Sequence, residues 1–190
     1  MKITLPDGSI RKLADGSSGL DLASDIGPGL AKAAVAVIVN GIQKDLSDPI
    51  DQDSEVSIIT IDSDEGLEIM RHTLTAQVLA RAVKNLYPDT KLAIGPTIAD
   101  GFYYDFEFKK AISPDDLASI EKEMKKIISN GSSITKTLHS KSDAMNIFKG
   151  VNESYKESII SESEQDDNFQ LYYQDNNEFV DLCRGPHLPS

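Results

Sequence analysis

The stretch Val35-Ala36-Val37-Ile38-Val39-Asn40-Gly41 decides the fold of the first third of the chain. Five small or β-branched apolar residues in a row are typical of a strand that is buried on both faces. Asn-Gly directly after such a run is a strong signal for a tight hairpin turn. We therefore expect a buried strand at residues 35–39 that ends in a hairpin.

Shorter strand and helix signals surround this buried strand. They predict a β-grasp fold over residues 1–62, made of two short strands, a small helix and two further strands. The remaining segments are the strands Lys2–Leu5 and Ile10–Leu13 around a Pro-Asp-Gly turn, a helix beginning at Ser18, and a last strand at Glu55–Ile61.

The pattern changes after Ile61 to long helical periods. Asp62, with Glu65 three residues later, resembles a capping box, and Pro88 ends the helix that follows near Tyr87. Ser113-Pro114 begins another helix, whose buried face we assign to Leu117, Ile120, Met124, Ile127 and Ile128. A strand at 134–138 and a hairpin at 169–182, turning at 175–177, complete the segment. Residues 63–190 therefore read as a second, α+β domain with a long helix on an antiparallel sheet.

The composition is that of an ordinary globular protein, with 39% hydrophobic and 26% charged residues. No stretch approaches the roughly 20 apolar residues of a membrane span, so we expect no membrane partner. A single cysteine excludes an internal disulfide and fits a reducing, cytoplasmic compartment. A net charge of −12 argues against wrapping duplex nucleic acid, but a single-stranded end held in a pocket remains compatible with it.

Chemistry is concentrated in Asp181-Leu182-Cys183-Arg184-Gly185-Pro186-His187, near the end of the sequence. The segment places the one cysteine four residues before one of three histidines, beside an aspartate and an arginine. A thiol and an imidazole at this spacing can form a metal site or an acid–base site. Taken alone, a cysteine is more often a small buried apolar residue.

Three motifs together resemble the N-terminal region of threonyl-tRNA synthetases, a TGS domain followed by the second additional domain, which edits mischarged tRNA. The motifs are the segment just described, Met70–Gln77, and the pair Ala93–Pro96 and Gly101–Asp105. The resemblance runs from Met1 to Ser190. It implies catalytic roles for Cys183, His187, Lys156, Asp181 and His72, and contacts of Tyr104, Thr73 and Arg184 with the substrate.

The first histidine motif departs from the family. The family reads Arg-His-small-x-Ala-His, whereas this chain reads Arg71-His72-Thr73-Leu74-Thr75-Ala76-Gln77, with one extra residue and glutamine in place of the second histidine. The extra residue can be absorbed as a π-bulge, or the helix can stay regular with His72 out of register. In either case we expect Gln77 to face the cavity and to take the catalytic place of that histidine, with editing weakened. Glutamine is a poor zinc ligand, so we expect no tightly bound metal.

The resemblance implies hydrolysis of seryl-tRNA(Thr), with the tRNA(Thr) acceptor end as partner. Two alternatives stay open: a catalytically silent module that binds the acceptor arm, and a freestanding trans-editing factor. ATP and zinc belong to a ligase core that these 190 residues lack, so no cofactor is expected here. A homodimer is expected only through further domains of a longer protein.

Overall fold

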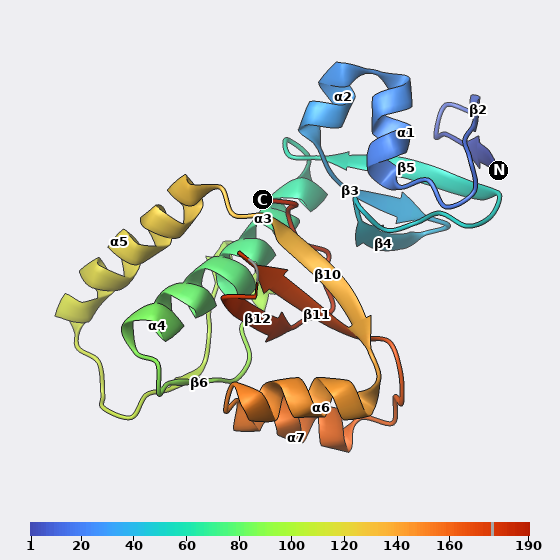
Figure 1. Cartoon of the computed structure of the whole chain (residues 1–190). Coiled ribbons are helices and arrows are strands. Elements are labelled where there is room, and N and C mark those ends of the chain that lie inside the picture. The colour runs from blue at the N-terminus through green and yellow to red at the C-terminus, as the bar shows by residue number, and fades with distance from the viewer. Residues whose placement is uncertain (176) are drawn as a thin grey trace. The chain divides into compact units, whose positions relative to one another are not determined.

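The computed structural model describes residues 1–175 and 177–190. Their contacts divide the chain into two compact units (Figure 1). The first comprises residues 1–70 and 185–189, and the second comprises residues 71–184 and Ser190. No helix within the described ranges is long and apolar enough to cross a membrane.

The first unit is a five-stranded β-grasp sheet in the order β2-β1-β5-β3-β4. β1 runs parallel to β5, and the other neighbouring pairs are antiparallel. One helix, α1, begins with a capping box at Ser18 and packs Leu22 into the same core as Ile3 and Val37. The elements are β1 Lys2–Thr4, β2 Ile10–Lys12, α1 Gly19–Ile26, α2 Pro28–Ala33, β3 Ala34–Val39, β4 Ile42–Asp45 and β5 Ser54–Thr60.

The predicted hairpin forms at Asn40-Gly41. Both residues adopt positive φ, 50° and 81°, as a two-residue turn of this type requires. β3 then pairs with β4 from Val39–Ile42 onwards. β4 is a strand that we did not predict, because it is a short edge strand whose first residue, Ile42, is exposed.

A long helical segment follows β5, as predicted. It consists of α3 Asp64–Thr73, a π-helix η1 Leu74–Leu79, and α4 Ala80–Leu86. The first turns of α3 belong to the first unit, because Ile69 packs with Val35 and Ile59. The strand-to-helix junction lies where we placed it, yet the compact unit extends to Met70 rather than ending at residue 62, and it includes residues 185–189.

The second unit is α+β. Its antiparallel sheet has the order β10-β11-β12, and α6 and α7 share a core with β11 that contains Phe148, Ile160 and Leu171. The elements of this part are β10 Ile134–His139, α6 Lys141–Gly150, α7 Ser154–Glu162, β11 Phe169–Gln174 and β12 Phe179–Leu182. The β11–β12 hairpin was predicted to turn at 175–177; Asn176 lies outside the described residues, and its neighbours Asp175 and Asn177 have positive φ.

A second core lies between the helical segment and α5, Pro114–Asn130, which is capped by Ser113 as predicted. Val78 and Val83 pack there against Ile120 and Ile127. Two short strand pairs connect these helices: β6 Lys91–Leu92 with β9 Phe106–Glu107, and β7 Thr97–Ile98 with β8 Gly101–Phe102.

The predicted buried face of α5 was too wide. Leu117 and Ile128 are 57% and 54% exposed. The described contacts of α5 are with η1 and α4, so only a narrow stripe around Ile120 and Ile127 is covered.

Candidate active site

The second unit contains a cavity of about 620 Å³ at the C-terminal end of β12. Five parts of the chain form its wall: the helical segment, the loop after β6, the segment between β8 and β9 that carries Tyr104, α7 with the loop after it, and the segments around β11 and β12. The lining residues that the sequence motifs had singled out are His72, Ala93–Pro96, Tyr104, Lys156, Asp181, Cys183 and Arg184.

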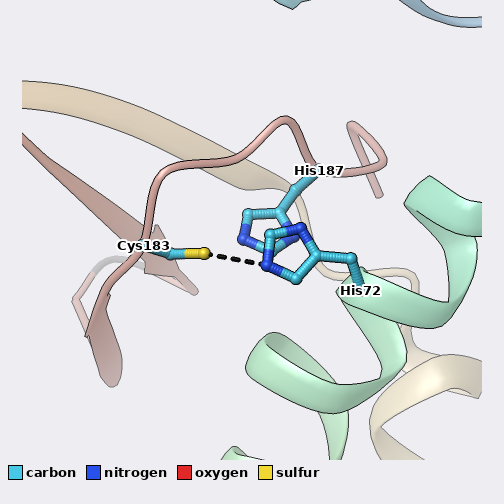
Figure 2. Close-up of side chains that lie close together, drawn as sticks. All are labelled: His72, Cys183 and His187. Carbon is cyan, nitrogen blue, oxygen red and sulfur yellow. Dashed lines mark hydrogen bonds between the residues drawn. The ribbon is translucent and has the colours of Figure 1, made fainter. Parts of the chain in front are cut away.

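The thiol of Cys183 points at the imidazole of His72 (Figure 2), with 3.0 Å between Sγ and Nε2. Cys183 follows β12 directly, and its backbone N–H donates to the carbonyl of Gln170 at 3.3 Å, which ties the residue to the neighbouring strand. A thiol and an imidazole at this distance can exchange a proton and can together hold a water molecule.

His187 is buried, and its backbone N–H donates to Oδ1 of Asp45 at 3.0 Å. His187 belongs to the first compact unit and is not among the residues that line the cavity, whereas His72 and Cys183 both line it. A thiolate and an imidazole are ligands that zinc accepts, and catalytic zinc sites usually have three protein ligands. The absence of a tight metal site therefore stays a prediction, to be tested by metal analysis.

Lys156 and Asp181 form a buried ion pair in the cavity wall, with 2.8 Å between Nζ and Oδ1. Burial raises the pKa of the Asp181 carboxyl; the Lys156 ammonium opposes this increase, and the charge of Glu153 adds to it. The pair places one positive and one negative group at the wall without net charge. Such a pair can orient a polar ligand, and its ammonium can stabilise a developing negative charge.

Tyr104 contributes an aromatic part of the wall. Its ring stacks on Phe106, with 4.4 Å between ring centroids. Burial raises the pKa of the Tyr104 hydroxyl, and the negative charges of Asp181 and Cys183 raise it further. The hydroxyl therefore stays protonated and available as a hydrogen-bond donor or acceptor.

Gly95 lets the Tyr104 ring lie against the loop after β6. A Cβ at this position would lie 2.2 Å from Cδ2 of Tyr104 and 2.6 Å from Cγ2 of Thr75. The Ala93–Pro96 motif was noted from the sequence, but this requirement for glycine depends on two distant residues and has no local signal.

The expected place of Gln77 was wrong, although the π-bulge that we considered does form. Gln77 is fully buried and does not line the cavity; Ala76 does. Its side-chain oxygen and its backbone carbonyl both accept from Nε2 of Gln174, at 2.9 and 2.8 Å. The widened π-turn, in which the N–H of Ala80 donates to the carbonyl of Thr75, points Gln77 at β11 instead.

Thr73 was also expected at the substrate, and the structure places it elsewhere. It is 4% exposed and does not line the cavity. His72 is the residue of this helix turn that reaches the cavity, together with Ala76 four positions later. Arg184, by contrast, lines the cavity and has an exposed side chain, and its contact with the substrate stays a prediction.

Comparison with known proteins gives the class of the first unit. Residues 1–60 match the sequence model of the TGS domain. The particular likeness is to threonine–tRNA ligases: the chain resembles their N-terminal region over nearly its whole length. It is 47% identical over 188 residues to the enzyme of Hahella chejuensis, 48% over 188 to that of Acidithiobacillus ferrooxidans, and 49% over 189 to that of Paramagnetospirillum magneticum. Each match covers 99% of this chain and 29% of the relative, so the chain spans less than a third of those proteins.

Proposed function

We propose that this chain hydrolyses the ester bond of seryl-tRNA that carries the threonine acceptor, as the editing part of a threonine–tRNA ligase. The observation that supports it most is the pairing of Cys183 with His72 at 3.0 Å on the wall of a cavity that also holds the Lys156–Asp181 pair. The similarity to threonine–tRNA ligases supplies the substrate class.

Such an activity has a physical reason. A synthetic site built for threonine must also admit serine, and one missing methyl group discriminates only about 10–200-fold. A second site that accepts serine and excludes the methyl group of threonine removes the remaining errors. The 620 Å³ cavity has room for an aminoacyl ester and its ribose.

In the proposed reaction, the Cys183 thiol holds a water molecule against the ester carbonyl, together with the adjacent ribose hydroxyl. The water attacks the carbonyl carbon, and the negative charge that develops on its oxygen is stabilised by the Lys156 ammonium. Collapse of this intermediate breaks the bond to the ribose oxygen, which takes up the proton that the attacking water gives up, and serine is released with a free carboxyl group. His72 keeps the Cys183 thiol aimed at the water.

The test is deacylation of seryl-tRNA(Thr) by this chain and by Cys183→Ala, with threonyl-tRNA(Thr) as the control substrate. We expect hydrolysis of the seryl ester to exceed that of the threonyl ester, and Cys183→Ala to lose it. Equal rates for wild type and Cys183→Ala would contradict the proposal.

A second candidate function is a silent module that binds the tRNA acceptor arm. It is favoured by the composition of the cavity wall: among the described residues of the helical segment only His72 and Ala76 line the cavity, and only His72 carries a titratable side chain. This function predicts that seryl-tRNA(Thr) binds to the chain and keeps its seryl ester. Measuring binding and deacylation on the same preparation separates the two functions.

A further inference from the structure

Glu153 lies outside the cavity wall and is almost completely buried, at 2% exposure. A buried carboxylate is costly unless it is paired and hydrogen-bonded. Oε1 of Glu153 accepts from the Lys84 ammonium at 2.6 Å, and Oε2 accepts from the backbone N–H of Leu92 at 2.9 Å. These bonds join three elements: α4, β6 and the start of α7.

Lys84 has no donor to spare in this arrangement. Besides Glu153, its ammonium donates to the carbonyls of Pro88 and Thr90, at 3.0 and 2.9 Å. It therefore fixes the turn that leads from α4 into β6. A second link runs beside it, because the Lys91 ammonium donates to the carbonyl of Asn152.

Two parts of the cavity wall begin immediately at these contacts. Leu92, which donates to Glu153, is followed by Ala93–Pro96, all of which line the cavity. Glu153 is the N-cap residue of α7, its carbonyl accepts from the N–H of Glu157, and the third residue of that helix is Lys156. Glu153 therefore sets the position of the helix that carries Lys156 relative to the loop that carries Gly95.

We propose that Glu153 is a positioning residue of the cavity. Its bonds to Leu92 and Lys84 fix the position of the Lys156 ammonium relative to the loop Ala93–Pro96. The inference rests on the proposed function, since it assigns Glu153 a part in the same hydrolysis without contact with the substrate. The charge of Glu153 also reaches the cavity, where it contributes to the raised pKa values of Asp181 and Tyr104.

The first experiment measures single-turnover deacylation of seryl-tRNA(Thr) by wild type, Glu153→Gln and Asp175→Asn. Asp175→Asn is the matched control, because Asp175 pairs with Arg81 at 2.7 Å in the same unit and does not line the cavity. A displacement of about 1 Å can cost about 100-fold in rate. We expect Glu153→Gln to lower the saturating deacylation rate at least about tenfold and to change the half-saturating protein concentration less than about threefold. The saturating rate of Asp175→Asn should stay within about twofold of wild type.

The second measurement does not depend on activity. Backbone amide resonances of Gly95 and Lys156 should shift in Glu153→Gln and stay in place in Asp175→Asn. Unmoved resonances, or a wild-type deacylation rate in folded Glu153→Gln, would overturn the inference. If wild type itself does not hydrolyse seryl-tRNA(Thr), the proposed function fails, and the resonances alone decide whether Glu153 positions the wall.

Glu153→Asp serves as the second variant if Glu153→Gln does not fold. It keeps the negative charge opposite Lys84 but shortens the side chain by one methylene, so it moves α7 without leaving Lys84 unpaired. The same two measurements then apply, with a smaller expected loss of rate.

Discussion

Nε2 of Gln174 donates to both the side-chain oxygen and the backbone carbonyl of Gln77, at 2.9 and 2.8 Å. Oε1 of the Gln174 side chain accepts in turn from the Arg81 guanidinium at 3.1 Å. The Arg81 guanidinium also forms ion pairs with the carboxylates of Asp175 and Glu178, at 2.7 and 3.0 Å. Gln77 thus belongs to a buried polar network that fastens the helical segment to the β11–β12 hairpin.

Gln77→Ala should therefore affect stability rather than hydrolysis. It removes an acceptor from the buried amide of Gln174, and such a loss costs about 1–3 kcal/mol. Urea unfolding measures the free energy of unfolding, and the control Lys122→Ala, on an exposed part of α5, should change it by less than about 0.5 kcal/mol. Gln77→His should not raise the deacylation rate, because the side chain at this position points at β11. A large gain in rate for Gln77→His would show that the side chain reaches the cavity.

His72→Ala should reduce hydrolysis strongly, because the Cys183 thiol loses its partner at 3.0 Å. If the imidazole acts as general acid or base, the loss is about 10²–10⁴-fold. His139→Ala is the matched control: His139 lies on β10, where Nε2 contacts the Thr137 hydroxyl, and it does not line the cavity. Similar rates for the two variants would remove His72 from the chemistry.

Some features follow from the sequence because local chemistry alone determines them. Asn40-Gly41 forms a hairpin whose positive φ values those residues tolerate, and Ser113 with Pro114 starts a helix wherever it packs. These two signals need no knowledge of distant contacts. The place of Cys183 at the cavity was expected instead from the resemblance of three motifs to threonyl-tRNA synthetases.

Other features depend on distant partners and could not be predicted in this way. The direction of Gln77 depends on the π-helix and on Gln174, which lies 97 residues away. The proposed role of Glu153 depends on Leu92 and Lys84, which lie 61 and 69 residues away in the sequence. The extension of the first unit to Met70 depends on Ile69 packing with residues of β3 and β5.

The Lys156–Asp181 pair should give a strong double-mutant coupling. Both side chains are almost fully buried, so removing one partner leaves the other without its counter-charge and costs about 3–5 kcal/mol. Lys156→Met with Asp181→Asn removes both charges and should cost less than the sum of the single changes. Urea unfolding of wild type, the two single variants and the double variant gives the coupling energy. Additive costs would show that the pair is not coupled.

The single variant Lys156→Met should also depend on pH. Burial already raises the pKa of Asp181 above its unfolded value, and losing the ammonium removes the influence that opposes this increase. The folded variant therefore binds a proton more tightly than the unfolded chain does. Its stability should fall as pH rises from the unfolded pKa of about 3.9 through the folded pKa. The free energy of unfolding of Lys156→Met, measured relative to wild type at pH 5.0 and 7.5, should be reduced more at pH 7.5.

Gly95→Ala should damage the cavity through Tyr104. The added methyl carbon would lie 2.2 Å from the Tyr104 ring and 2.6 Å from Thr75, so the ring must leave its stack on Phe106 or the loop must move. Overpacking of this kind costs about 1–3 kcal/mol, and we expect deacylation to fall because Tyr104 and Gly95 both line the cavity. Gly101→Ala is the control, since its Cβ would meet no atom within 4 Å. If Gly95→Ala retained both the stability and the deacylation rate of Gly101→Ala, the packing of Tyr104 against this loop would have no part in shaping the site.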